Sequence, residues 1–239
     1  MTPTQPILKV ENLQVNYGDF RAIEGASLEV EGGKIVSVIG ANGSGKSTLL
    51  NAICGMLKPV SGKVFFEGKP ITGMRPDKLV TMGISLVPEG GQVFQSLTIL
   101  ENLLMGAYIP SARKNRNELL KKVYRLFPVL EEKATQLAGN LSGGQRQMLA
   151  VGRALMSNPK LIIFDEISLG LAPTVIKDIY AQIKLINQEG TTIILVEQDV
   201  RRSLKTSDVS YILLNGRIVL SGKSKELTAD DVRSAYFGV

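Results

Sequence analysis

The chain has 239 residues, of which 44% are hydrophobic and 21% are charged, a composition typical of a packed globular protein rather than a disordered one. It has no histidine and one cysteine, Cys54, which excludes an intrachain disulfide, a cysteine–histidine zinc site and catalysis by a histidine base. The formal net charge of +6 favours anionic partners such as nucleotides, nucleic acid or acidic lipid headgroups, although a merely solvated basic surface has the same composition.

The N-terminal part of the chain predicts an antiparallel sheet. Residues 7–10, 27–30 and 63–67 are short β-rich segments, and glycine-containing turns separate them. The first six residues lack the basic start and apolar core of a secretory signal, and no apolar run approaches the roughly 18–20 residues needed to cross a bilayer. We therefore expect a cytoplasmic protein whose contact with a membrane is peripheral or indirect.

A phosphate-binding loop follows an apolar strand expected at residues 35–39. The loop reads Gly40-Ala41-Asn42-Gly43-Ser44-Gly45-Lys46-Ser47-Thr48, and an apolar helical stretch that contains Cys54 comes next. This is the P-loop pattern G-x-x-x-x-G-K-S in its strand–loop–helix context, where backbone N–H groups and the helix N-terminus bind phosphate. Gly40 and residues 42–48 are thus candidate ATP ligands. Lys46 is expected to bridge the β- and γ-phosphates and Ser47 to ligate Mg²⁺, and Cys54 to be a small buried side chain.

The middle of the chain, residues 99–156, is expected to be mostly helical. Its basic cluster forms either a solvated helix face or a docking or lipid-facing surface, and consists of Arg113, Lys114, Arg116, Lys121, Lys122 and Arg125. Further on, Ser142-Gly143-Gly144-Gln145 precedes another helix, with Ser142 as the expected N-cap and two glycines that expose the backbone. This is a second anion site. Because one P-loop already serves one triphosphate, we infer that it serves a nucleotide held by another subunit.

An apolar strand expected at residues 161–164 ends in Asp165-Glu166. A strand that delivers a carboxylate beside a P-loop is the Walker B arrangement, in which Asp165 holds Mg²⁺ through water and Glu166 polarises the attacking water as general base. Taken alone, the same pair would favour a helix N-cap, but beside a P-loop we favour the catalytic interpretation.

The remaining elements complete an α/β fold. A third apolar strand is expected at 192–196, with helical stretches between the strands and right-handed crossovers. Asn215-Gly216 between segments 211–214 and 217–220 predicts a β-hairpin. The predicted fold is a P-loop NTPase core with a parallel sheet, an N-terminal antiparallel β subdomain and an inserted helical subdomain.

The sequence Leu141-Ser142-Gly143-Gly144-Gln145, with the P-loop upstream and Asp165-Glu166 downstream, looks like the nucleotide-binding domains of ABC proteins. The resemblance covers nearly the whole chain and implies one ABC ATPase domain over 1–239, with a helical signature subdomain inserted at approximately 90–156. It also implies head-to-tail dimers in which ATP lies between the P-loop of one subunit and the L-S-G-G-Q of the other, so that Ser142 and Gly144 contact the partner's γ-phosphate. Tyr17 matches the aromatic that stacks on adenine, unless it is a core tyrosine of the β subdomain.

Two positions depart from the general ABC pattern. Glu89, in Val87-Pro88-Glu89-Gly90, stands where most members have a glutamine that links Mg²⁺ to the transport partner. It either reaches Mg²⁺ or the attacking water, or faces solvent. Gln198 stands where most members have a histidine that contacts the γ-phosphate. It can donate a hydrogen bond but carries no charge, and slower hydrolysis is the expected effect.

These departures, together with residues 168–173 and the ending Ala235-Tyr236-Phe237-Gly238, resemble the LivF-type ATP-binding subunits of branched-chain amino acid importers. Gly91 stands where that subgroup usually has arginine. The resemblance implies a subunit on the inner face of the membrane that energises import of branched-chain or other hydrophobic amino acids. Its implied partners are a second nucleotide-binding subunit, identical or not, membrane permease subunits and, indirectly, an extracytoplasmic solute-binding protein.

Two other functions fit parts of the sequence. A soluble ABC ATPase that remodels a protein or nucleic-acid complex agrees with the basic pI of about 9.4. Members that act on DNA carry long coiled-coil or zinc insertions, which this sequence lacks, so we expect no nucleic-acid partner. A P-loop kinase would explain residues 40–48 but leaves L-S-G-G-Q without a purpose.

Overall fold

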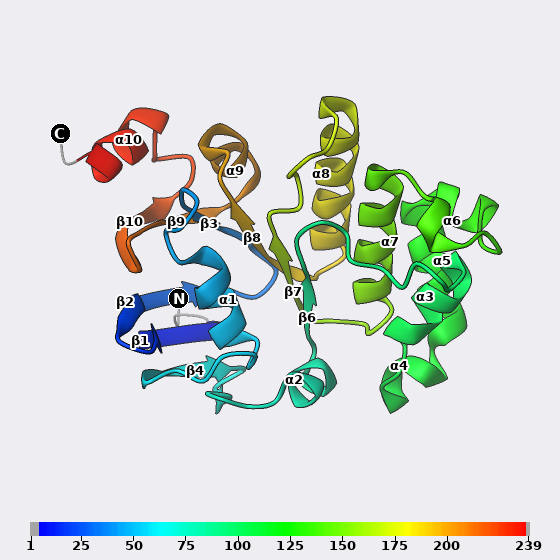
Figure 1. Cartoon of the computed structure of the whole chain (residues 1–239), viewed down its shortest axis with the longest axis horizontal. Coiled ribbons are helices and arrows are strands. Elements are labelled where there is room, and N and C mark those ends of the chain that lie inside the picture. The colour runs from blue at the N-terminus through cyan, green and yellow to red at the C-terminus, as the bar shows by residue number, and fades with distance from the viewer. Residues whose placement is uncertain (1–4, 238–239) are drawn as a thin grey trace.

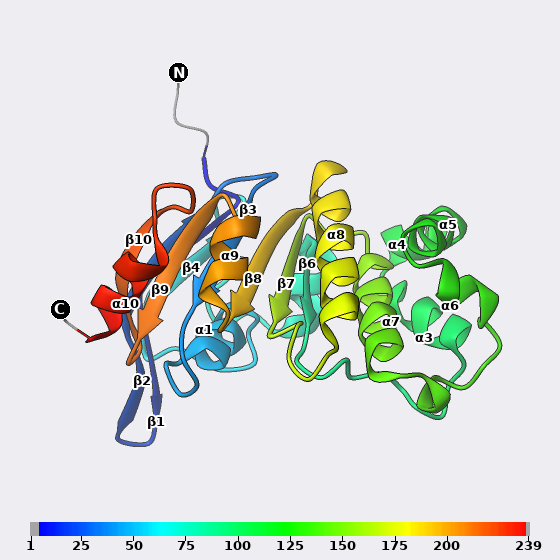
Figure 2. The ribbon, with the colours of Figure 1, turned by 90° about the horizontal axis from the view of Figure 1, so that it is seen from above.

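The computed structural model describes residues 5–237, which form two β-sheets and the helices around them (Figures 1 and 2). The first four residues, part of the segment expected to lack a signal, and Gly238 of the C-terminal motif lie outside this range. In the described part of the chain, no helix combines the length and the apolar character needed to span a membrane.

The first sheet is antiparallel and has the strand order β2-β1-β4-β5. Its strands are β1 (Leu8–Tyr17), β2 (Phe20–Val30), β4 (Ser61–Phe66) and β5 (Lys69–Pro70). Buried and more exposed residues alternate along β1. Leu8 and Val10 are buried, and after a register shift the buried positions are Leu13 and Val15. The expected antiparallel sheet is confirmed, but β1 and β2 run further than predicted and form a long hairpin with Gly18 in its turn.

The second sheet has six strands in the order β10-β9-β3-β8-β7-β6. Five of them are parallel, β3 (Ile35–Ile39), β6 (Ile84–Val87), β7 (Leu161–Asp165), β8 (Thr192–Glu197) and β9 (Val209–Leu214), and the edge strand β10 (Arg217–Lys223) is antiparallel. The three predicted apolar strands are central, and the hairpin at Asn215-Gly216 is confirmed. Both turn residues have positive φ (47° and 77°), as a type I′ turn requires. Strand β6 was not predicted, because four residues before a proline give too short a pattern.

Helix α1 (Lys46–Ile53) lies between the two sheets, whereas α8 (Pro173–Gln188) and α9 (Val200–Thr206) cover the other face of the second sheet (Figures 1 and 2). Neighbouring residues of one strand therefore enter different cores: Ile163 packs with α1, and Phe164 packs with α8. Cys54 is buried in the α1 core, where burial raises the pKa of its thiol to about 12. It is the expected small buried side chain.

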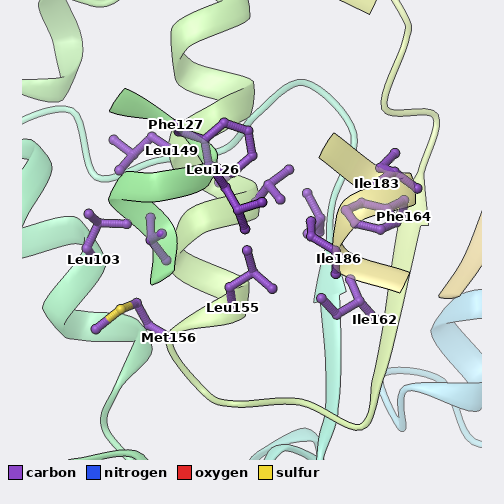
Figure 3. Packing of buried hydrophobic residues seen from close by; sticks show 14 of the residues in the cluster. Leu103, Leu126, Phe127, Leu149, Leu155, Met156, Ile162, Phe164, Ile183 and Ile186 are labelled. Atoms are coloured by element: carbon purple, nitrogen blue, oxygen red, sulfur yellow. The ribbon is translucent and has the colours of Figure 1, made fainter. Parts of the chain in front are cut away.

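A helical region packs beside α8. It comprises α3 (Ile99–Gly106), α4 (Pro110–Lys114), α5 (Arg116–Leu126), α6 (Pro128–Glu132), the 3₁₀ turn Ala138–Asn140 and α7 (Gly143–Leu155). Figure 3 shows that its apolar side chains, such as Leu103 and Leu155, form one cluster with Phe164 and Ile183 of the sheet layer. The other two helices are α2 (Pro76–Met82) and α10 (Ala229–Phe237). Helix α10 packs near α9.

The basic cluster spans two helices, because α4 ends and α5 begins around Asn115. Most of its side chains are exposed. Lys122 and Arg125 each lie 2.7 Å from the carboxylate of Glu189, just beyond the end of α8. Part of the cluster thus joins the helical region to the core, and the rest is exposed, which agrees with either a solvated face or a docking surface.

Four buried serine hydroxyls meet beside the start of β9 in the second sheet. Ser37 on β3, Ser207 and Ser210 at β9, and Ser224 after β10 are joined by oxygen–oxygen contacts of 2.7 to 3.2 Å. Ser207 also donates to the Ser203 carbonyl at 2.7 Å. The cluster ties three neighbouring segments together through uncharged groups.

Candidate functional site

The P-loop wraps tightly between β3 and α1. Gly43 and Gly45 have φ of 79° and 103°, conformations that residues with a side chain rarely adopt. A Cβ at Gly45 would also stand 2.8 Å from the Ala22 carbonyl oxygen, and one at Gly40 would stand 2.2 Å from Ser44 Oγ. Conformation therefore favours glycine at position 43, close packing favours it at position 40, and both favour it at position 45.

A cavity of about 330 Å³ opens in front of this loop. It is lined by Asn42, Gly43, Gly45, Lys46, Ser47 and Thr48, by Tyr17, Phe20 and Ala22 of the first hairpin, and by Glu89, Glu166 and Leu169. Most of the predicted site residues thus come together. Gly40 and Ser44 pack against each other within the loop and do not line the cavity. Asp165 and Gln198 contact residues of the cavity without lining it.

A charged pair occupies the centre of the site. Lys46 Nζ lies 3.0 Å from Glu166 Oε1 and donates to the Ala41 carbonyl at 3.0 Å. The other carboxylate oxygen of Glu166 accepts from Gln198 Nε2 at 2.6 Å. Both side chains of the pair are less than a tenth exposed. Glu166 also has a φ of 44°, the kind of backbone strain that clusters at functional sites.

Asp165, next to this pair, is held in an unfavourable environment for its charge. Burial, followed by the carboxylates of Glu166 and Glu89, raises the pKa of Asp165 from 3.8 to about 6, against the opposing effects of Lys46 and Ser47. Its Oδ1 atom and Ser44 Oγ are buried and have no hydrogen-bond partner among residues 5–237. Carboxylate and hydroxyl oxygens are the ligands that Mg²⁺ prefers, so Asp165 and Ser47 fit this metal.

The L-S-G-G-Q residues lie elsewhere. Ser142 Oγ accepts from the Gln145 N–H at 3.3 Å, and Gln145 Oε1 accepts from the Ser142 N–H at 3.2 Å, which is a capping box on α7. Neither these two residues nor Gly143 and Gly144 line the cavity, and both views place α7 apart from α1 with β7 and β8 between them (Figures 1 and 2). One chain therefore does not bring the P-loop and this motif together.

Glu89 reaches the cavity from the loop after β6. The next residues, Gly90 and Gly91, both have positive φ, 76° and 58°. A Cβ at Gly91 would stand 2.9 Å from Gln147 Oε1 and 3.0 Å from the Gln147 nitrogen on α7. A side chain at position 91 would therefore combine a left-handed backbone with close contacts to α7, and glycine suits the conformation found here.

Tyr17 is half exposed at the mouth of the cavity rather than packed in the core of the first sheet. Phe20 is a second aromatic at the same place and was missed in the sequence analysis. It pairs with Tyr17 across the hairpin and is 69% exposed. The Gly18-Asp19 turn is the signal that would have placed the two rings together. Ala22 and Leu169 were missed as well, and nothing in their local sequence marks them.

Comparison with known proteins decides the family. Residues 23–168 match the family described as ABC transporter. The chain belongs to the ABC transporter family. This ABC subunit is 44% identical over 233 residues to the high-affinity branched-chain amino acid transport ATP-binding protein BraG of Pseudomonas aeruginosa, covering 97% of this chain and 100% of the relative. It is 36% identical over 222 residues to the probable branched-chain amino acid transport ATP-binding protein LivF of Archaeoglobus fulgidus, covering 92% and 94% of the two chains.

Solved structures agree with the ABC fold. An ATP-binding cassette of an ABC transporter in its ADP conformation is 34% identical, with a TM-score of 0.82 over 97% of this chain and 94% of that one. A dimeric ATP-binding cassette bound to ADP and Pi, in a post-hydrolysis state, is 28% identical, with a TM-score of 0.76 over 92% and 100% of the chains. The ABC ATPase fold predicted for this subunit is confirmed, and subunits of this family hydrolyse ATP.

Proposed function

We propose that this ABC subunit hydrolyses MgATP to energise an importer of branched-chain or other hydrophobic amino acids. The observation that carries the proposal is the buried Lys46–Glu166 pair at the P-loop, beside the unpartnered Asp165 oxygen. The names of the BraG and LivF relatives support the class of solute. The second candidate is a soluble ABC ATPase that assembles or remodels a protein complex, because the same nucleotide-site residues would serve both functions.

The residues of the cavity have distinct roles in this proposal. The loop N–H groups and Lys46 bind the triphosphate, and Tyr17 and Phe20 contact the base. Mg²⁺, held by Ser47 and Asp165, would neutralise phosphate charge. Because Lys46 is paired with Glu166 here, binding phosphate moves the lysine away from the carboxylate. Glu166, still hydrogen-bonded by Gln198, is then free to accept a proton from the attacking water. Glu89 lines the cavity and contributes charge to the Mg²⁺ side.

The site is completed by a second nucleotide-binding subunit, identical or not, whose Ser142-Gly143-Gly144-Gln145 equivalent covers the ATP. The solved dimeric cassette supports this arrangement. Ser142 and Gly144 lie outside the lining of their own chain's cavity, which supports a role for them at the partner's nucleotide. Closing two subunits on two ATP molecules changes the shape of the pair, since ATP then binds the closed state more tightly than the open one.

We propose that residues 90–156 form the helical subdomain that receives the permease. A groove of about 330 Å³ runs between this region and β6, and exposes the apolar side chains of Phe94, Met105 and Tyr108. Arg153 lies over the Phe94 ring, 5.0 Å from its centre. The Glu89 loop joins this groove to the nucleotide cavity. The chain would then lie on the cytoplasmic face of the membrane, with the solute-binding protein attached only through the permeases.

Purification of this subunit from its native membranes, with identification of the copurifying chains, tests the proposal. We expect two multi-span permeases, a nucleotide-binding subunit and a solute-binding protein. Recovery of soluble partners alone would overturn the transport function and favour the assembly ATPase. Hydrolysis of ATP without an added acceptor separates both from a P-loop kinase.

A further inference from the structure

A second cavity, of about 630 Å³, lies between α8 and α9 and is separate from the nucleotide cavity. On α8 its lining residues are 173, 176, 177, 180, 181 and 184. Steps of three and four residues put them on one face of the helix, over about 16 Å of its length. Both views show α8 and α9 side by side on the same face of the sheet (Figures 1 and 2). The cavity is therefore a groove built by two helices.

The groove carries a strong positive charge. Five of its lining residues are cationic, Lys177, Lys184, Arg201, Arg202 and Lys205, against the single carboxylate of Asp199. Arg202 pairs with Asp199 at 3.2 Å, while the other four cations form no ion pair with any described residue. Several unpaired cations around one cavity attract polyanions, and among residues 5–237 no carboxylate forms an ion pair with these four.

The floor of the groove is apolar. Pro173, Ile176 and Ala181 line it between the charged side chains. A volume of several hundred cubic ångströms with an apolar floor and a few convergent charges is typical of a small-molecule site rather than of a simple ion site. The ligand that matches both features has phosphate groups for the cations and an organic body for the floor.

A path of a cation–π contact, hydrogen bonds and one peptide bond leads from the groove to the catalytic centre. Arg202 lies over the ring of Tyr180, 5.4 Å from its centre. The Tyr180 hydroxyl donates at 2.6 Å to Glu197, whose buried carboxylate also accepts from Ser168 at 2.9 Å. Glu197 directly precedes Gln198, which holds Glu166. A ligand that draws Arg202 toward itself removes the cation from the Tyr180 ring. The hydrogen bond from Tyr180 to Glu197, and through Glu197 the position of Gln198, would then change.

We propose that the groove between α8 and α9 is an effector site that binds a phosphate-bearing organic anion and thereby slows ATP hydrolysis. The effect on hydrolysis rests on the proposed function, whereas binding does not. If the subunit hydrolyses no ATP, the proposed function fails and the binding measurement below still decides the site.

The test uses the full chain, with the P-loop saturated by MgADP, and 1-naphthyl phosphate as the probe in isothermal titration calorimetry. We expect binding of this probe, and much weaker binding of 1-naphthol, which lacks the anion, and of inorganic phosphate, which lacks the body. The double variant Lys184→Glu/Lys205→Glu should weaken binding by about tenfold or more, because charge-assisted contacts to phosphate are lost. The matched double variant Lys114→Glu/Arg116→Glu, on an exposed face outside the groove, should leave it unchanged.

Turnover at saturating MgATP supplies the second readout. We expect the probe to lower kcat by about twofold or more in the unaltered chain. In Tyr180→Phe, which removes the hydroxyl that reaches Glu197, the probe should still bind but should no longer change kcat. Binding that is unaffected by the Lys184/Lys205 reversal, or an unchanged kcat in the unaltered chain, would overturn the proposal. So would tighter binding of a deca-glutamate peptide than of the probe in the same groove, which would indicate an acidic protein segment instead.

Discussion

At the scale of single residues, the centre of the site is a lysine and a glutamate that neutralise each other. Lys46 and Glu166 are both buried, and neither would be tolerated there as an isolated charge. The pairing gives Lys46 two alternative anions, the carboxylate and a phosphate. We infer that the base becomes available only when nucleotide takes the lysine, which limits the reaction of water to the occupied site.

The substitution Glu166→Gln should preserve ATP binding and reduce turnover by about 10²–10⁴-fold, because the amide cannot accept the proton of the attacking water. Calorimetry of MgATP binding and a phosphate-release assay measure the two effects. The control Glu132→Gln alters an exposed carboxylate that does not line the cavity, and should leave the rate unchanged. Turnover of Glu166→Gln within twofold of the unaltered chain would remove Glu166 from the role of base.

The raised pKa of Asp165 makes a second residue-scale prediction. A carboxyl whose native pKa is about 6 and whose ordinary value is 3.8 binds protons more tightly in the folded chain, so stability falls as pH rises between these values. In nucleotide-free, metal-free protein, Asp165→Asn should therefore raise the melting temperature more at pH 8 than at pH 5. Circular dichroism melts at the two pH values measure this, and an equal shift at both would contradict the assignment of the charge to Asp165.

At the scale of elements, the loop after β6 combines two tasks. Its Glu89 lines the nucleotide cavity, and its Gly91 packs on α7, the helix that carries the L-S-G-G-Q residues at its start. Two successive glycines with positive φ let the chain turn sharply between these contacts. The loop is thus a short stretch of chain that links the wall of the nucleotide cavity to the helical region.

Alanine at the two glycines separates conformation from packing. Gly90→Ala places a Cβ in open space and should cost about 1–2 kcal/mol of unfolding free energy through the left-handed backbone alone. Gly91→Ala has the same backbone cost plus a clash with Gln147, and should lose about 1–3 kcal/mol more. Urea unfolding monitored by circular dichroism distinguishes them. Equal losses for both variants would show that the contact with α7 gives way easily.

At the scale of the whole molecule, the two anion-binding helix ends belong to different surfaces. The cavity at α1 is complete except for a group to cover the nucleotide, and the capped start of α7 is turned to a different place (Figure 2). In the head-to-tail pair proposed above, each chain would supply half of each of two sites.

Replacing Ser142 by aspartate tests this pairing while keeping the helix intact, because aspartate is as good an N-cap as serine. The added negative charge should repel the partner's γ-phosphate. We expect unchanged MgATP binding by the isolated chain, and an ATPase rate in the assembled complex that is lower by about tenfold or more. Ser111→Asp on exposed α4 serves as the control. Weaker ATP binding by the isolated Ser142→Asp chain would place Ser142 at its own nucleotide.

Much of this arrangement could be predicted from local sequence. Strands β3, β7 and β8 are short apolar runs, and the P-loop and the Asn215-Gly216 turn are patterns that few other structures produce. The location of Phe20 could have been predicted from the Gly18-Asp19 turn beside it. The Lys46–Glu166 contact depends on the order of strands in the sheet, which neighbouring residues do not encode. The pairing of Lys122 and Arg125 with Glu189 depends on the placement of α5 beside the end of α8, which periodicity does not reveal.

The buried serines of the second sheet have one further consequence. Ser207 gives its hydrogen to the Ser203 carbonyl, which leaves three hydroxyl hydrogens for the contacts among the four oxygens, and five such contacts are present. The hydrogens can therefore be distributed in several nearly equivalent ways, and rotating one hydroxyl shifts the others. This proton disorder preserves some entropy inside the core. It also means that these serine contacts carry no charge and should respond to neither salt nor pH, unlike the Lys46–Glu166 pair of the nucleotide site.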